Sequence, residues 1–124
     1  MTLSVAQIDR ETDALVDEWL TLPQVAQRLD LSIGRAKQLL KDHKLLGVRR
    51  GSGGPQVPAV FLQGQEVMKG LPGTLTVLLD AGYDDIQALR WLFTPDESLP
   101  GSPIEAIKAG RHTEVKRRAQ ALAF

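Results

Sequence analysis

The sequence contains no cysteine, so it can form neither a disulfide nor a thiolate metal site. It has two histidines, too few for a site built from several imidazoles, and we expect no metal and no cofactor. No apolar run approaches the roughly 20 residues that span a bilayer, and the first seven residues lack the features of a signal peptide. These absences favour a cytoplasmic protein without a membrane segment.

The formal net charge is zero, which by itself argues against a nucleic-acid partner. The charge is unevenly distributed, however, because residues 31–50 hold six basic residues and one acid. Residues 1–30 and 51–100 each carry a net charge of −4, and residues 101–124 carry +3. A basic segment inside an acidic chain is typical of a protein that binds nucleic acid through one region. The alternative interpretation is a solvated helix face.

Two short helices joined by a turn are predicted between residues 21 and 43. Thr21 is a suitable N-cap, Pro23 falls in the first turn, and Gln24 completes a capping box. Ser32 caps the second helix. The expected buried positions are Leu22, Val25, Ala26 and Leu29 in the first helix and Ile33, Ala36, Leu39 and Leu40 in the second. Two capped helices with a turn of about three residues are the pattern of a helix-turn-helix.

A basic hairpin is predicted over residues 48–58. Arg49 and Arg50 end a short extended run, and the sequence Gly-Ser-Gly-Gly at residues 51–54 allows a tight turn. Pro55 and Pro58 favour extended backbone after the turn. Residues 59–62 are expected to return to the core as a helical turn or a strand.

The rest of the chain is expected to be helical. Ser4 and Gln7 suggest a capped helix over residues 5–18, either frayed or docked. Further helices are predicted over 72–80, 85–93, 103–109 and 113–124, the last with Val115, Ala119 and Leu122 inward. We therefore divide the chain into a mobile or loosely docked N-terminal helix (1–18), a helix-turn-helix with its hairpin (19–70) and a C-terminal helical domain (71–124).

The second helix of the helix-turn-helix carries side chains that can read bases in the major groove. Arg35 and Gln38 lie three residues apart and share a face, and they can form bidentate contacts with guanine and adenine, respectively. Lys41 extends the same line. The remaining expected DNA contacts, mainly to phosphates or the minor groove, are Ser32, Lys37, Lys44, Arg49, Arg50, Ser52 and Gln56.

Other polar groups form no convincing catalytic arrangement. The pairs Asp84-Asp85 and Asp96-Glu97 suit a helix cap and a solvated loop better than a metal or acid–base site. His43 has no nucleophile beside it, and residues 51–54 lack the Gly-Lys-Ser/Thr ending of a phosphate-binding loop. We therefore expect a DNA-binding protein and not an enzyme.

Several motifs resemble known families. Residues 19–26 (WLTLPQVA) and 44–51 (KLLGVRRG) resemble the excisionase/MerR-type winged helix-turn-helix. Residues 71–78, 81–83 and 90–95 further resemble a family of small actinobacterial DNA-binding proteins, one mycobacterial member of which is a Ser/Thr protein kinase substrate. The resemblance implies a mainly α fold with a small β-hairpin wing: a winged helix-turn-helix followed by a helical C-terminal domain. It also implies a kinase partner, with Thr2, Ser4 and Thr12 as phosphorylation candidates in an exposed N-terminus.

The C-terminal third resembles the toxin-binding domain of certain antitoxins, through Arg90-Trp91-Leu92, Leu99, residues 101–104 and Gly110-Arg111. Two hypotheses follow. The first is a transcriptional regulator that binds double-stranded DNA in the nucleoid. The second is an antitoxin-like or adaptor module that binds a protein through residues 90–124, with the helix-turn-helix as scaffold. Because the tail lacks sustained heptads, we expect a monomer or a weak homodimer.

Overall fold

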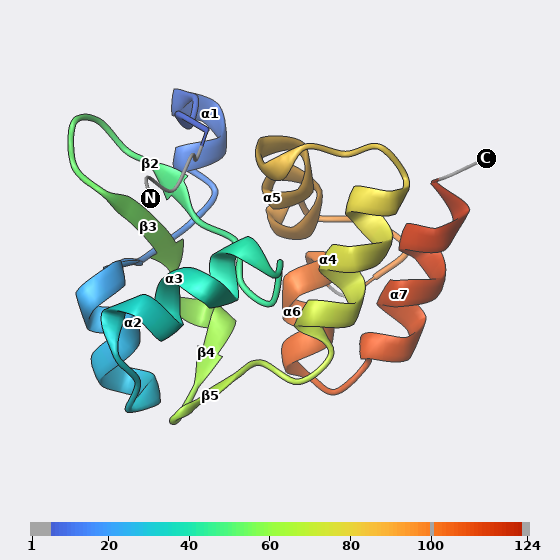
Figure 1. The fold of residues 1–124 in the computed structure, drawn as a ribbon. Helices are drawn as coiled ribbons and strands as arrows, with labels where there is room; N and C mark the ends of the chain where they lie inside the picture. Colours follow the sequence, from blue (N-terminus) through green and yellow to red (C-terminus); the bar gives the residue numbers. More distant parts are fainter. Residues whose placement is uncertain (1–5, 100, 123–124) are drawn as a thin grey trace.

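The computed structural model describes residues 6–99 and 101–122 (Figure 1). The first half contains α1 (Arg10–Asp13), β1 (Trp19–Thr21), α2 (Leu22–Leu29), α3 (Ile33–Lys41), β2 (Val48–Arg49) and β3 (Pro55–Pro58). The 3-10 turn η1 (Ala59–Phe61) and the strands β4 (Leu62–Gln63) and β5 (Glu66–Val67) follow. The second half consists of α4 (Leu71–Asp80), α5 (Asp85–Phe93), α6 (Pro103–Lys108) and α7 (His112–Ala121). This arrangement confirms the mainly α fold class with a small β-hairpin.

Side-chain caps begin both helices of the helix-turn-helix, as predicted. The Thr21 hydroxyl accepts from the Gln24 backbone N–H, and Gln24 Oε1 accepts from the Thr21 backbone N–H at 2.8 Å. Ser32 Oγ accepts from the Arg35 backbone N–H at 3.1 Å and caps α3. Between the helices, Asp30 has a φ of 56°, a left-handed conformation that ends α2 and produces the tight turn.

A three-stranded antiparallel sheet of order β1-β3-β2 supports the helix-turn-helix. Trp19 lies opposite Pro58 across one edge of β3, and Val48 lies opposite Gln56 across the other. The β2–β3 hairpin is the predicted one. Strand β1 was not predicted, because three residues are too few to show the alternation of a strand. The residues after the hairpin form both alternatives that were expected, a helical turn (η1) followed by a strand (β4).

The four C-terminal helices follow the sequence expectations closely. Asp84 begins α5 with a capping box, and Ser102 begins α6 by accepting from the Glu105 backbone N–H. In α7, Val115 and Ala119 are fully buried. Leu122, which was expected to point inward, is 36% exposed, so that prediction is wrong. It lies at the C-cap, beyond the last turn that is buried against the other helices.

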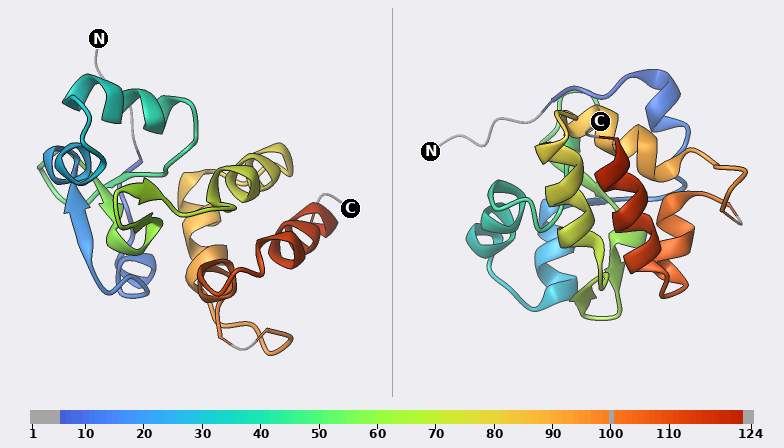
Figure 2. Two further views of the ribbon diagram at one scale, coloured as in Figure 1. Left: turned by 90° about the horizontal axis from the view of Figure 1, so that it is seen from below. Right: turned by 90° about the vertical axis from the view of Figure 1, so that its right-hand side faces the viewer.

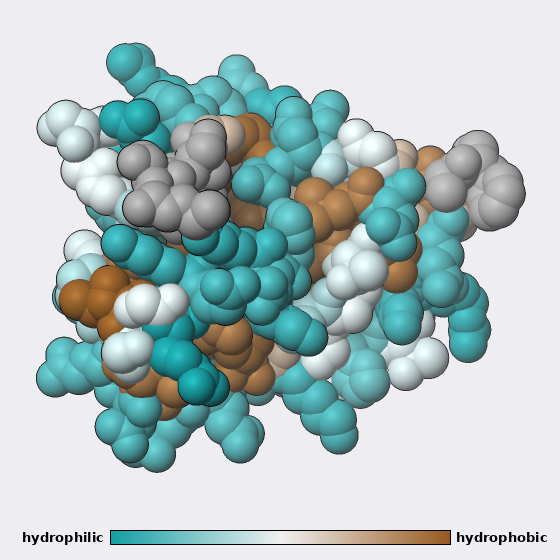
Figure 3. All heavy atoms as spheres, viewed as in Figure 1, coloured by the Kyte–Doolittle hydropathy of each residue, from teal (hydrophilic) through white to brown (hydrophobic). Residues whose placement is uncertain are grey.

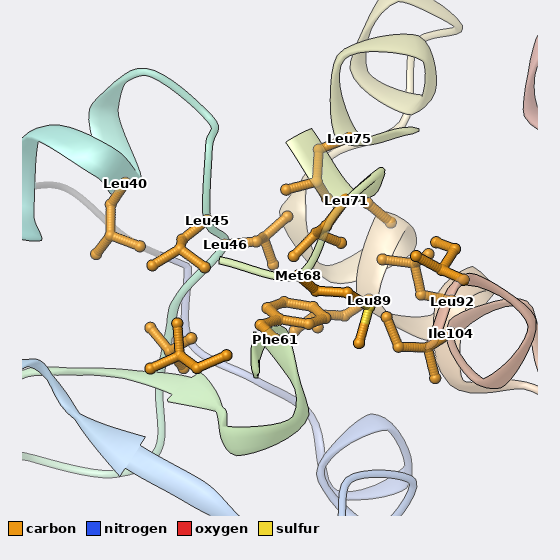
Figure 4. Close-up of a cluster of buried hydrophobic side chains, with 14 of the residues drawn as sticks. Leu40, Leu45, Leu46, Phe61, Met68, Leu71, Leu75, Leu89, Leu92 and Ile104 are labelled. Carbon is orange, nitrogen blue, oxygen red and sulfur yellow. The ribbon is translucent and has the colours of Figure 1, made fainter. Parts of the chain in front are cut away.

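One continuous hydrophobic core joins the two halves of the chain. Figure 4 shows Phe61 and Met68 lying between the leucines of the helix-turn-helix side and those of the C-terminal helices. Phe61 is fully buried, and its ring centroid lies 5.8 Å from that of Phe93 in α5. In Figure 2, α4 to α7 gather on one side of this core and the sheet with α2 and α3 on the other. Burial of these side chains is therefore shared between the two regions.

No helix in the described part of the chain has the length and apolar character needed to cross a membrane.

The N-terminal segment differs most from the prediction. The helix is the short α1, Arg10–Asp13, and its cap is Asp9, whereas the expected helix covered residues 5–18. Ser4, the expected cap, lies outside the described residues. Gln7, expected in the capping box, instead forms a parallel β-bridge with Arg49. The expected helix is wrong because residues 6–8 add backbone hydrogen bonds to the edge of β2, and a helix there would lose them.

Candidate nucleic-acid interface

Helix α3 packs on the core through one face and leaves the opposite face in solvent. Ala36 is fully buried and Leu40 is 7% exposed. Gly34, Gln38 and Lys41 follow one another at four and three residues, so they share the face that points away from Ala36. Figure 3 shows hydrophilic side chains covering most of this region in the view of Figure 1. The helix thus presents a polar outer face, as the sequence predicted.

Four cations surround this face without acidic partners. Arg35, Lys37, Lys44 and Arg49 are exposed, and within residues 6–99 and 101–122 none of them forms an ion pair. Unneutralised cations on a convex helix and on the strand after it produce a positive potential that attracts phosphates. All four of these predicted DNA contacts are therefore accessible from solvent.

Gln38 has a partner in the absence of DNA. Its Nε2 donates to Asp42 Oδ1 at 2.9 Å, from one turn earlier in the helix. Both residues are exposed, so this hydrogen bond can exchange for another acceptor at little net cost. Reading adenine would require the amide to leave Asp42.

Ile33 departs from the predicted buried stripe. It is 47% exposed, so the expectation that it packs inward is wrong. Ile33 lies at nearly the same helical phase as Leu40, but it is the first residue of α3, where the helix projects beyond the elements that bury Leu40. The next residue, Gly34, is also open, since a Cβ built there would meet only Ser32 Oγ at 3.9 Å.

Arg49 and Arg50, predicted together to hold DNA, lie in different environments. Arg49 is exposed, whereas Arg50 is half-buried with its guanidinium 4.8 Å from the centroid of the Trp19 ring. Arg50 Nη2 lies 3.0 Å from Asp13 Oδ1, and Nη1 donates to Gln56 Oε1 at 3.1 Å. In this state Arg50 ties the hairpin to β1 and to the N-terminal segment.

The tip of the hairpin carries no large side chain. Residues 51–54 are all exposed, Ser52 among them. Gly51 has a φ of 96° and therefore requires glycine, whereas a Cβ at Gly53 or Gly54 would meet nothing within 4 Å. Internal packing does not demand glycine at the last two positions, so the tip is free to approach another molecule closely.

The N-terminal segment adds an acidic layer beside the hairpin. The Arg49 backbone N–H donates to the Ala6 carbonyl at 2.8 Å, which extends the edge of β2. Asp9 accepts hydrogen bonds from the hydroxyl and the backbone N–H of Thr12, and these bonds lower the pKa of Asp9. Arg90 of α5 lies 3.3 Å from Asp9 and holds the segment against the C-terminal helices. The segment is therefore docked on both halves of the molecule.

The contacts of the N-terminal segment determine whether the predicted phosphorylation site Thr12 is accessible. Thr12 was expected to be exposed, but it is fully buried, so that expectation is wrong. Its burial follows from the cap of α1, because the Thr12 hydroxyl donates to Asp9 Oδ1 at 2.7 Å. Thr2 and Ser4 lie outside the described residues.

Sequence reasoning missed the residues that position the hairpin. Asp13 contacts Arg50 across 37 positions of the sequence, and Trp19 contacts the same arginine from a distant strand. No local pattern reveals such contacts. The exposure of Ile33 was missed because the apolar period of a helix says which face is buried, not how far along the helix the burial extends. The run of charged residues around Asp13 gave no separate signal.

The fold and this surface define a winged helix-turn-helix protein with a helical C-terminal region. Residues 7–62 match the family model described as "DNA-binding protein Rv2175c, wHTH domain", and residues 68–123 match "Rv2175c C-terminal domain of unknown function". The DNA-binding protein Rv2175c of Mycobacterium tuberculosis is 43% identical over an alignment of 116 residues, and the match covers 83% of this chain and 79% of the relative. The chain belongs to the Rv2175c family.

A solved structure supports the same assignment. The NMR structure of Rv2175c superposes with a TM-score of 0.82 at 37% identity, and the match covers 98% of this chain and 90% of that one. The predicted family of small actinobacterial DNA-binding proteins is thus confirmed, and the family is not one of enzymes. The likenesses to excisionase/MerR-type proteins and to antitoxins, and a protein partner for residues 90–124, stay predictions.

Proposed function

We propose that this protein binds double-stranded DNA as a transcriptional regulator, with α3 in the major groove and the β2–β3 hairpin on the backbone or in the adjacent minor groove. Arg35, Gln38 and Lys41 read base edges from the outer side of α3. Ser32, Lys37, Lys44 and Arg49 contact phosphates, and Ser52 at the hairpin tip makes a further contact. A cytoplasmic, nucleoid-associated location belongs to the same proposal.

The exposed cations Arg35, Lys37, Lys44 and Arg49, which form no ion pair within the described residues, carry this proposal. Lys37, Lys44 and Arg49 leave their charge available to a phosphate. The winged helix-turn-helix family assignment supports the same use of this surface, since the named relative is a DNA-binding protein. A helix with long polar and cationic side chains on its outer face can enter a major groove about 12 Å wide and reach the base edges.

Arg50 and Gln56 contribute differently from the other predicted contacts. Because Arg50 is engaged by Asp13 and Gln56, its first role is to hold the hairpin in position. A phosphate can replace Asp13 as the partner of the guanidinium when DNA is bound, since the ion pair is partly exposed. Arg50 then adds a backbone contact, whereas Gln56 continues to support the strand.

The test measures binding to a mixed-sequence duplex by fluorescence anisotropy at several salt concentrations. The three cations assigned to phosphates, Lys37, Lys44 and Arg49, predict a log–log slope of about −2.7. Lys37→Ala should weaken binding to every duplex and flatten this slope by about one, whereas Arg35→Ala should reduce discrimination between duplexes. Lys116→Ala is the matched control, because Lys116 is an exposed cation on α7, across the molecule from the hairpin (Figure 1). Equal salt slopes for the two lysine variants would contradict the proposed surface.

A further inference from the structure

The outer end of α3 combines a large apolar side chain with a bare backbone. Ile33 and Leu122 are the exposed large hydrophobic residues in the described part of the chain, and Ile33 is the one that lies on α3. Figure 3 shows a brown area interrupting the teal surface at the end of α3 that lies beside α2. A single exposed isoleucine is ordinary in itself. This isoleucine, however, lies on the helix proposed to read DNA, where an apolar side chain can contact a base.

Gly34 is the second observation. Glycine lowers the stability of a helix relative to alanine, and no close contact with another described residue requires it, since a Cβ there would meet only Ser32 Oγ at 3.9 Å. Gly34 also lies on the face of α3 that points away from the core. Both features, an apolar side chain left in water and a missing side chain beside it, have a use if the first turn of α3 is pressed against another surface.

We propose that Ile33 is a specificity-determining residue that contacts the 5-methyl group of thymine in the major groove. The inference rests on the proposed function and adds a residue to it. The N-terminal residues of such a helix approach base edges, and the thymine methyl is the one apolar group that the major groove offers. Isoleucine suits this contact because its β-branched side chain is restricted to few rotamers before binding.

The chemistry of the contact predicts a specific pattern of selectivity. Arg35 and Gln38 recognise hydrogen-bond donors and acceptors, and uracil and thymine present the same ones. Ile33 instead distinguishes these two bases, because they differ only in the 5-methyl group. Burying one methyl changes affinity by about fourfold, so each contacted thymine should contribute about that factor.

The experiment compares two duplexes of the same mixed sequence, one with thymine and one with deoxyuridine at every thymine position. The full chain should bind the thymine duplex about fourfold more tightly. In Ile33→Ala this ratio should fall to about one, and Ile33→Val should give an intermediate ratio. Leu122→Ala, which removes the other exposed large apolar side chain, should keep the ratio of the unmodified protein. Thermal denaturation should show all three variants folded, since both side chains are partly in solvent.

Each other outcome overturns the inference in a recognisable way. If the unmodified protein binds both duplexes equally tightly, the protein binds DNA but does not contact the thymine methyl group. If Ile33→Ala keeps the full ratio, another residue reads the methyl. If the variant changes the sedimentation of the DNA-free protein and not the ratio, Ile33 belongs to a protein contact. If neither duplex is bound, both the proposed function and the inference about Ile33 are refuted.

Discussion

Gly34→Ala should stabilise the protein and weaken its binding to DNA. Alanine is favoured over glycine in a helix by roughly 0.5–1 kcal/mol, and the lower value applies here because Gly34 is the second residue of α3. The added Cβ meets Ser32 Oγ at 3.9 Å, an ordinary van der Waals contact, so no strain offsets the gain. We expect the midpoint of thermal unfolding to rise by about 2 °C.

The loss of DNA affinity follows from the position of the new methyl group. Gly34 lies on the outer face of α3, so a methyl there would hold the helix away from the base edges. A good bidentate contact contributes about 1–3 kcal/mol, and weakening one of them by half or more corresponds to about a tenfold loss of affinity. Fluorescence anisotropy with a mixed-sequence duplex measures this loss on protein whose folding has been verified by circular dichroism.

Gly73→Ala is the matched control for Gly34→Ala. Gly73 is the third residue of α4, and a Cβ there would meet only the flexible end of Lys116, at 3.7 Å. The control should gain a similar amount of stability without any change in DNA affinity. If Gly34→Ala binds DNA as tightly as the control, the outer face of α3 does not lie against the duplex and the reasoning is refuted.

Three further predictions concern the hairpin, the N-terminal segment and the core. Asp13→Asn should release Arg50 for a phosphate and steepen the salt dependence of DNA binding by about 0.9 in log–log slope, whereas Asp17→Asn, an exposed acid nearby, should change it less; equal slopes would exclude this use of Arg50. Docking of residues 6–9 should weaken as the pH falls below about 4. Hydrogen bonds from Thr12 lower the pKa of Asp9 in the folded state. The stabilisation that Asp9 gives to the docked segment is therefore present above its unfolded-state pKa and is lost as the pH falls through its folded-state pKa. Hydrogen exchange at the Arg49 amide, which donates to Ala6, should then become faster relative to the core amides, and unchanged protection would contradict the link. Phe61→Ala should lower the free energy of unfolding by about 3–5 kcal/mol in denaturant titration, and separate transitions for the two halves would contradict the shared core.

Local chemistry explains why most elements could be predicted from the sequence. The caps at Thr21, Ser32, Asp84 and Ser102 all begin helices in the structure, because each side chain satisfies backbone N–H groups that the first turn leaves unpaired. The hairpin was predictable for a similar reason, since glycine and proline restrict the backbone locally. These signals lie within a few residues of the structure they determine.

The N-terminal segment was mispredicted because its structure depends on distant partners. The sequence before residue 18 is compatible with a helix, but residues 6–8 hydrogen-bond to the edge strand β2 instead. Asp9, the actual cap of α1, is held by Arg90 from a helix 81 residues away. A tertiary hydrogen bond or ion pair of this kind outweighs the small propensities that a local pattern measures.

The different environments of Arg49 and Arg50 could not be predicted either, because they depend on residues that are distant in the sequence. Two consecutive arginines before a glycine-rich turn look equivalent in sequence, and the alternation of a strand says only that they point to opposite sides. The structure distinguishes them by what lies on each side: solvent for Arg49, and Trp19 with Asp13 for Arg50. The acid is supplied by the N-terminal segment, so docking of that segment and the charge available to DNA on the hairpin are coupled. A change that detaches residues 6–13 should therefore add a cation to the proposed DNA surface while removing the support that holds the hairpin in place.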